Sequence, residues 1–132
     1  MTAVACPVAL HPDGAPRRIA MYLDAGSLLH AVREPLTPNA LPQAIAARAL
    51  YDQSGLETRA ALPFGTSDSI EQNILWHFTL CRIVPPVRNH WKHPAPDGSG
   101  LLQFYWICID GPAPYPVSGS TRNVLAWLQA TL

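Results

Sequence analysis

Apolar residues gather in short runs along the chain, and these runs predict strands. Two continuous runs, residues 73–84 (NILWHFTLCRIV) and residues 101–109 (LLQFYWICI), are rich in β-branched and aromatic side chains, which is typical of buried strands. Two shorter apolar runs on either side of residues 24–27 (DAGS) predict a β-hairpin. Residues 56–64 (LETRAALPF) predict one more strand.

Two other segments follow a helical pattern. Residues 40–54 are strong helix formers without an internal glycine, and Gly55 predicts the end of this helix. A second helix is predicted at about residues 120–131, where apolar side chains recur at helical spacing, with Ser118 or Ser120 as its cap. Strands on both sides of a central helix, with a second helix after them, indicate a mixed α/β (α+β) domain.

Polar, turn-forming segments separate these elements and predict loops. They include residues 65–69 (GTSDS) and the long connection at residues 85–100 (PPVRNHWKHPAPDGSG). The chain shows no internal repeat and no linker-like segment, and its 132 residues are a common size for a domain. We therefore expect one domain over residues 1–132.

Composition narrows the classes of partner. The formal net charge is zero, so no general electrostatic field attracts a polynucleotide or an anionic membrane surface. No apolar run approaches the roughly eighteen residues needed to span a bilayer. The three cysteines are widely spaced and form no CxxC pair, which favours reduced packing residues and a cytoplasmic location.

The last turns of the central helix carry the most informative motif, "RALYDQSGL" at residues 48–56. It resembles the signature of the Nudix superfamily, in which Arg-Glu-apolar-x-Glu-Glu-x-Gly-apolar closes a loop–helix–loop motif. Arg48, Leu50, Gly55 and Leu56 match this signature without a gap. The resemblance implies a Nudix-like α/β/α sandwich with a mixed β-sheet, in which the predicted central helix is the Nudix helix.

Most acids of that signature are missing from this chain. In Nudix enzymes, glutamates on one helix face hold Mg²⁺ or Mn²⁺, which clamps a diphosphate while water attacks phosphorus. The corresponding positions here carry Ala40, Ala49, Asp52 and Gln53, and Glu34 stands where the family has a glycine. Asp52 alone keeps a charge among the replaced acids, so we expect at most weak binding of Mg²⁺ or Mn²⁺, with Asp52 as the metal ligand.

The altered motif leaves it open whether the chain is an enzyme. In the first hypothesis, the hydrolytic centre has decayed and the domain binds a nucleotide-like or phosphorylated small ligand, with a homodimer as a possible assembly. In the second, an active atypical hydrolase cleaves a nucleoside diphosphate linked to another group, with Asp52 as the chief catalytic residue and Gln53 or Glu34 assisting. The third is a structural module for protein interaction. Arg48 and Asp52 are four residues apart and can also pair as inherited scaffold.

Other side chains are candidates for ligand contact, because an aromatic face can stack on a base and a cation can meet phosphate. The residues that we expect to contact the ligand for these reasons are Arg33, Arg48, Trp91 and Lys92. Histidine is a common zinc ligand, and the chain has three candidates in His77, His90 and His93. Their spacing favours packed or half-exposed side chains over a metal site.

Aromatic side chains alternate along the two buried strands. Trp76 and Phe78 share one face of their strand, and Phe104 and Trp106 share one face of theirs. We expect these side chains to form the core or a subunit interface, with ligand stacking as the alternative.

Overall fold

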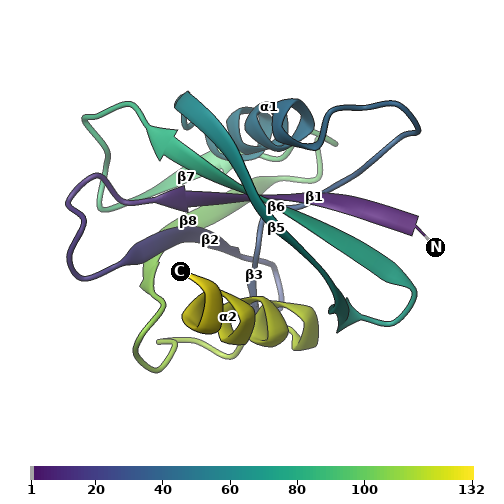
Figure 1. Cartoon of the computed structure of the whole chain (residues 1–132). Coiled ribbons are helices and arrows are strands. Elements are labelled where there is room, and N and C mark those ends of the chain that lie inside the picture. The colour runs from purple at the N-terminus through teal and green to yellow at the C-terminus, as the bar shows by residue number, and fades with distance from the viewer. Residues whose placement is uncertain (1) are drawn as a thin grey trace.

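The computed structural model describes residues 2–132 as one mixed sheet between two helices, with α1 on one face and α2 on the other (Figure 1). The helices are α1 (Pro42–Ser54) and α2 (Gly119–Thr131). The strands are β1 (Thr2–Leu10), β2 (Arg18–Leu23), β3 (Leu29–His30), β4 (Glu34–Pro35), β5 (Thr58–Glu71), β6 (Ile74–Ile83), β7 (His90–Pro94) and β8 (Leu101–Cys108). This is the α/β/α sandwich that the resemblance to the Nudix superfamily implies.

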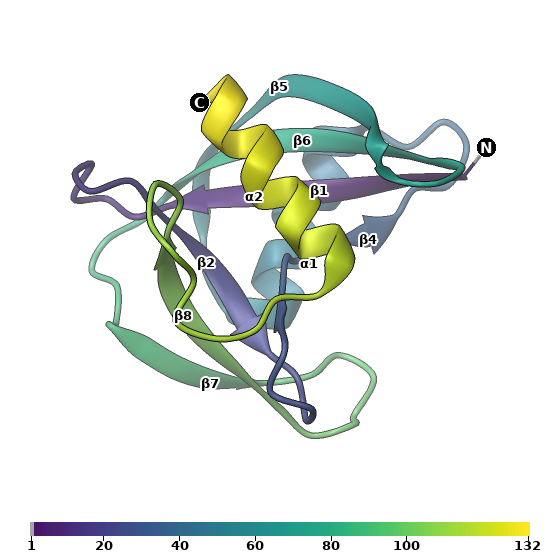
Figure 2. The same cartoon turned by 90° about the horizontal axis from the view of Figure 1, so that it is seen from below.

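The sheet has the strand order β5-β6-β1-β2-β8-β7, with β3 paired to β2 and β4 paired to β1. The β1–β6 pair is parallel, and the other pairs are antiparallel. Seen from the α2 side, α2 crosses β1 and β6, while β7 and β8 extend beyond it (Figure 2). Because β5 and β7 stand at the two ends of the strand order, they are the edge strands of the sheet.

Both predicted helices are confirmed. Helix α1 begins with a proline at its first position and ends at Gly55, whose φ of 78° is left-handed and whose N–H donates to the carbonyl of Tyr51 at 2.8 Å. Helix α2 is capped by Ser118, whose Oγ accepts from the N–H of Thr121 at 3.2 Å. Of the two predicted caps, Ser118 is the one used.

Strand β1 lies in the middle of the sheet, although the sequence analysis assigns no strand there. Its proline, Pro7, is usually evidence against a central strand because it has no N–H to donate. On one side β1 follows β6 along its whole length, but on the other it pairs with β4 only at Val4 and Ala5 and with β2 only at Leu10. Pro7 falls between these two contacts, so its missing N–H leaves no partner strand unbonded.

Two predicted loops are wrong in part, because each contributes to an edge strand. Residues 65–69 continue β5, which pairs with β6 through several register shifts. A Cβ at Gly65 would lie 2.8 Å from the Trp127 ring of α2, so the strand has room for that ring only because this residue is glycine. The connection at residues 85–100 contains β7, which pairs with β8. An edge strand needs partners on one side only and tolerates polar residues and proline.

The sheet separates two apolar clusters. The cluster on the α2 side includes Trp76 and Phe78, packed with Val124 and Leu128. The cluster on the α1 side includes Phe104 and Leu50, with Trp106 packed against it. The prediction that these aromatic side chains form the core is therefore confirmed. Within the described part of the chain, no helix has the length and apolar character required to cross a membrane.

Candidate functional site

One of the signature positions of α1 lies on the buried side of the helix and carries no carboxylate. Helix α1 packs mainly against β1, and the buried residues at this contact are small: Ala49 is 4% exposed, and Ala46 and Ala5 are fully buried. Small side chains let the helix lie close to the sheet. The position at which the Nudix signature has a glutamate, Ala49, therefore serves as packing surface.

The two neighbouring signature positions have different environments. Asp52 is exposed in the last turn of α1. Gln53 is half-buried, and its Nε2 donates to the backbone carbonyl of Arg33 at 3.2 Å, which ties α1 to the chain just before β4. Glu34 lies in β4, half-buried and paired with Ala5 of β1. Gln53 is thus engaged in a structural contact, and its carbonyl oxygen is a neutral ligand at best.

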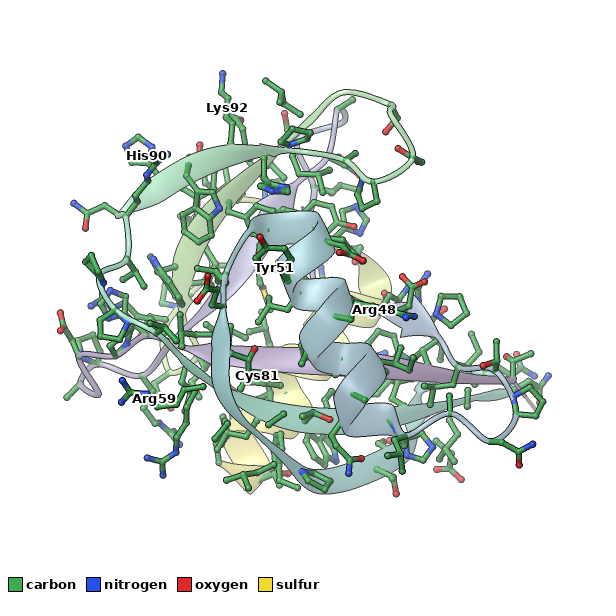
Figure 3. The ribbon with its side chains drawn as sticks, turned by 90° about the horizontal axis from the view of Figure 1, so that it is seen from above. Arg48, Tyr51, Arg59, Cys81, His90 and Lys92 are labelled. Atoms are coloured by element: carbon green, nitrogen blue, oxygen red, sulfur yellow. The ribbon has the colours of Figure 1, made fainter. Side chains whose placement is uncertain are left out.

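These residues do not assemble into a cluster of acids. Among residues 2–132, no group of three His, Cys, Asp or Glu side chains is placed to hold one metal ion. The predicted scaffold pair is not formed either, since no ion pair joins Arg48 to Asp52 within that range. Arg48 is exposed and lies on the part of α1 away from β7, whereas Tyr51 lies nearer that strand (Figure 3).

Arg33 is held in a structural contact on the other face of the sheet. Its Nη1 forms an ion pair with Glu71 at the end of β5, and its guanidinium lies 5.5 Å from the centroid of the Trp76 ring. Trp76 belongs to the α2-side cluster. The Arg33 guanidinium is therefore engaged with Glu71 and Trp76, and no ion pair among residues 2–132 joins it to Asp52, although the sequence groups the two around one ligand.

A hollow at the carboxyl end of α1 brings two of the predicted ligand residues together. Trp91 and Lys92 of β7 line it, and its volume is about 300 Å³. The other residues of its wall come from the end of α1, the β6–β7 connection and β7: Ser54, Gly55, Leu56, Pro86, Val87, Arg88 and His93. Figure 3 shows β7 beside this end of α1, with His90 and Lys92 projecting from the strand.

Two tryptophans fix the walls of this hollow. The Trp91 Nε1–H donates to the carbonyl of Ser54 at 2.8 Å, and the Trp106 Nε1–H donates to the carbonyl of Arg88 at 2.8 Å. The Trp91 ring also stacks on Phe104, with centroids 5.3 Å apart and planes inclined by 10°. Since both bonds join an indole to backbone, they hold the end of α1 and the β6–β7 connection in defined positions.

The lining of the hollow is cationic. Arg88 and Lys92 are exposed, and neither takes part in an ion pair with any other described residue. No carboxylate is part of the lining. The His93 Nδ1 lies 3.0 Å from the carbonyl of Pro94, and since a carbonyl only accepts, this nitrogen carries the hydrogen and Nε2 is left as an acceptor in the neutral ring. Arg88 is absent from the sequence-based candidates because its surroundings in sequence read as an ordinary polar loop.

The three histidines do not form one site. His77 lines a separate surface hollow with residues of the 35–42 segment, and His90 stacks on Tyr105 with centroids 6.1 Å apart. The ring of His93 lies against Gly55, where an added Cβ would be 3.0 Å from the imidazole Cδ2. Each histidine is therefore in a contact of its own. His77 and His93 are half-buried, as the packed or half-exposed alternative predicts, whereas His90 is exposed.

Another polar group, around Asp24, organises the turn between β2 and β3. The Asp24 carboxylate accepts from the N–H groups of Gly26 and Leu28 at 2.8 and 3.0 Å and lies 2.5 Å from the His30 Nε2. The backbone bond from Leu28 and then the bond from His30 lower the pKa of Asp24. All of these bonds lie within one turn, so the group is a turn-forming device.

Comparison with known proteins gives a consistent answer for the fold. No family model and no curated protein matches the sequence. Among solved structures, an ADP-ribose pyrophosphatase from Streptococcus suis superposes with a TM-score of 0.69 at 12% identity, covering 99% of this chain and 92% of that one. MutT described from Aliivibrio salmonicida and Vibrio cholerae gives 0.70 at 13%, covering 99% and 98%. A MutT Nudix hydrolase from Burkholderia pseudomallei gives 0.65 at 13%, covering 95% of each chain. These similarities extend over nearly the whole chain.

Proposed function

We propose that this chain, whose fold is that of the Nudix proteins, binds a nucleotide-like or phosphorylated small ligand and hydrolyses it slowly or not at all. The observation that carries this proposal is the state of the signature helix. Its frame is intact, with the glycine stop at Gly55, but Ala49 is buried packing surface and Gln53 is bonded to backbone. Fold alone does not fix activity, so the site decides.

A resident Mg²⁺ or Mn²⁺ ion does not fit these residues well. Such ions take six or more oxygen ligands and favour carboxylates. Asp52 supplies the only carboxylate among the replaced signature positions, and the Gln53 amide is fixed by its bond to the Arg33 carbonyl. We therefore expect any divalent ion to bind weakly, through Asp52.

The alternative is an active hydrolase with an unusual centre. It rests on Asp52, which is exposed and free to meet a ligand, and on Glu34, which lies in the strand next to the helix. In that case Asp52 is the chief metal ligand, and turnover disappears when its charge is removed. Two of the solved structures similar in fold are named as a pyrophosphatase and a hydrolase, which is the reason to consider hydrolysis for this chain as well.

A purely structural interaction module is less well supported. That reading rests on an aromatic face buried between subunits, but Trp76, Phe78 and Phe104 are buried in the core of the single chain. The chain also has a hollow with unpaired cations, which an interaction module does not need. A homodimer and the absence of a polynucleotide partner remain predictions, which sedimentation with and without RNA would test.

The proposal is tested by calorimetry and product analysis on the same protein. Mn²⁺ alone, then a panel of nucleoside mono- and diphosphate compounds, is titrated into the chain, and each mixture is assayed for released phosphate or nucleotide products. We expect at least one phosphorylated compound to bind, weak Mn²⁺ binding and little product. Robust Mg²⁺- or Mn²⁺-dependent product release that is lost in Asp52→Asn would contradict the proposal and support the hydrolase.

A further inference from the structure

The hollow at the carboxyl end of α1 has a composition that selects one kind of ligand. Its apolar and aromatic lining includes Leu56, Val87 and Trp91, and its cationic lining is Arg88 and Lys92. An apolar lining with a few placed polar groups is the usual make-up of a small-molecule site. The two cations favour an anion, and the indole and aliphatic side chains favour a flat apolar group attached to it.

The hollow also favours an anion that comes without a metal ion. Mg²⁺ and Mn²⁺ prefer carboxylate, carbonyl and water oxygens. The lining contains no carboxylate, and two of its side chains are permanently or normally positive, which repels a cation. The guanidinium of Arg88 can instead take an oxyanion directly, with two parallel hydrogen bonds.

Size limits the ligand further. A volume of about 300 Å³ is at the lower end of the range for small-molecule sites, which run from roughly 300 to 1,000 Å³. A mononucleotide-sized compound can fill such a hollow, whereas a dinucleotide or a nucleotide sugar has to extend beyond it. The walls are already fixed by the bonds from Trp91 to Ser54 and from Trp106 to Arg88. A ligand therefore does not need to order these segments when it binds, which lowers the entropy cost of binding.

The two cations are placed differently. Arg88 belongs to the connection that Trp106 anchors, so its backbone position is fixed beside the hollow. Lys92 lies one residue from Trp91 on β7, and neighbouring residues of a strand point to opposite faces. Lys92 also borders a second hollow with Asp24 and Gln103, so it lies at the rim between the two. Arg88 is therefore the stronger anion contact and Lys92 the weaker one.

We infer that the hollow formed by the end of α1, the β6–β7 connection and β7 binds an aromatic monophosphate of mononucleotide size without a metal ion, with Arg88 as its principal anion contact. This inference rests on the proposed function, because it names the ligand class and the place of binding. It differs from a site on the acid-bearing face of α1, since neither Asp52 nor Arg48 lines this hollow.

The test uses adenosine monophosphate as the probe, titrated calorimetrically into the full chain in the presence of EDTA. Adenosine without phosphate and inorganic phosphate are the partial ligands. Arg88→Gln and Lys92→Gln remove the two cations, and Arg122→Gln is the matched control, because Arg122 is an exposed arginine on α2, across the sheet. All three positions are exposed, and thermal unfolding confirms that each variant is folded.

We expect adenosine monophosphate to bind with EDTA present and more tightly than either partial ligand. Arg88→Gln weakens binding at least about tenfold, as loss of a hydrogen bond to a charged group predicts, and Lys92→Gln weakens it about two- to fivefold. Arg122→Gln leaves binding unchanged. In a nitrogen-proton spectrum, the indole N–H signal of Trp91 shifts on binding, while those of Trp76 and Trp127 do not.

The inference is overturned if EDTA abolishes binding, if Arg88→Gln binds as well as Arg122→Gln, or if adenosine monophosphate does not bind. Its failure can be told apart from failure of the proposed function. When another phosphorylated compound binds but Arg88→Gln has no effect on it, the proposed function stands and the hollow is not the site. When no phosphorylated compound of the panel binds, both fail.

Discussion

Restoring the missing glutamate at Ala49 should destabilise the domain rather than rebuild a metal site. Ala49 is 4% exposed beneath α1, beside the fully buried Ala46. A larger side chain there overpacks the contact between α1 and β1, at about 1–3 kcal/mol. Burial also disfavours the charged form of the new carboxyl group, and raising its pKa by about one to two costs about 1–3 kcal/mol at neutral pH. We therefore expect Ala49→Glu to lower the free energy of unfolding by about 2–6 kcal/mol, from a typical total of about 5–15 kcal/mol.

Two further variants separate the parts of this effect. Ala49→Gln has nearly the same shape without the charge, so its loss measures overpacking together with burial of a neutral polar group. Ala44→Glu adds the same charge at an exposed position in the first turn of α1, where a carboxylate is favourable, and should change stability by less than about 0.5 kcal/mol. Urea unfolding followed by far-ultraviolet circular dichroism measures all three, with comparable slopes required for the comparison.

The stability loss caused by the buried carboxyl group depends on pH, whereas a loss caused by overpacking does not. Burial raises the pKa of an introduced carboxyl above its unfolded value of about 4.3, so the folded state holds the proton more tightly. The extra loss of Ala49→Glu over Ala49→Gln should be present at pH 7 and shrink as the pH falls toward that unfolded value. The reasoning is refuted if Ala49→Glu is as stable as Ala44→Glu, or if it binds Mn²⁺ tightly.

Three other predictions follow from local structure. Leu41 is the N-cap of α1, is 64% exposed and makes no side-chain cap bond, so Leu41→Ser should raise the free energy of unfolding by about 1 kcal/mol, and an unchanged urea midpoint would contradict this. Gly55→Ala should lower it by about 1–2 kcal/mol, because φ is 78° and the new Cβ would lie 3.0 Å from His93, with the loss measured in the same urea titration. Burial raises the pKa of Cys81 to about 11, so at pH 8 iodoacetamide should label the half-buried Cys108 in the native protein and reach Cys81 only after unfolding, as peptide mass spectrometry would show.

The elements that the sequence predicts well are those in which local pattern and environment agree. The central helix is readable because helix formers, a first-turn proline and Gly55 all indicate the same segment. The buried strands β6 and β8 are readable because continuous apolar runs of this kind have few alternatives. The resemblance to the Nudix signature at the end of α1 rests on the spacing of a few residues along the chain, and this spacing can be read from one sequence without a structure.

The elements that the sequence misses depend on distant parts of the chain. Strand β1 is hidden by Pro7, which is tolerable only because β2 and β4 pair with the two ends of that strand and leave its middle free. The Arg33 side chain is held by an ion pair with Glu71 and by the Trp76 ring, and both residues are far from Arg33 in the sequence. The residues next to Arg33 in the sequence therefore do not predict these contacts. Arg88 becomes a candidate only once Trp106 of another strand is seen to fix its backbone.

The candidate site shows the same division. The motif places Asp52, Gln53 and Ala49 at signature positions, and their role in catalysis stays a prediction. Whether each side chain is exposed, bonded or buried follows from packing, which the motif does not contain. Trp91 and Lys92 line one hollow, whereas Arg33 and Arg48 are not part of its lining. The contact of these four residues with a ligand stays a prediction.

The central claim is that the signature helix has kept its place in the fold and lost its chemistry. The most direct measurement is a product assay with Mn²⁺ and a panel of nucleoside diphosphate compounds, run side by side on the unaltered chain and on Asp52→Asn. The account predicts that both release product at the same background rate. Turnover well above background in the unaltered chain, abolished in Asp52→Asn, would contradict it.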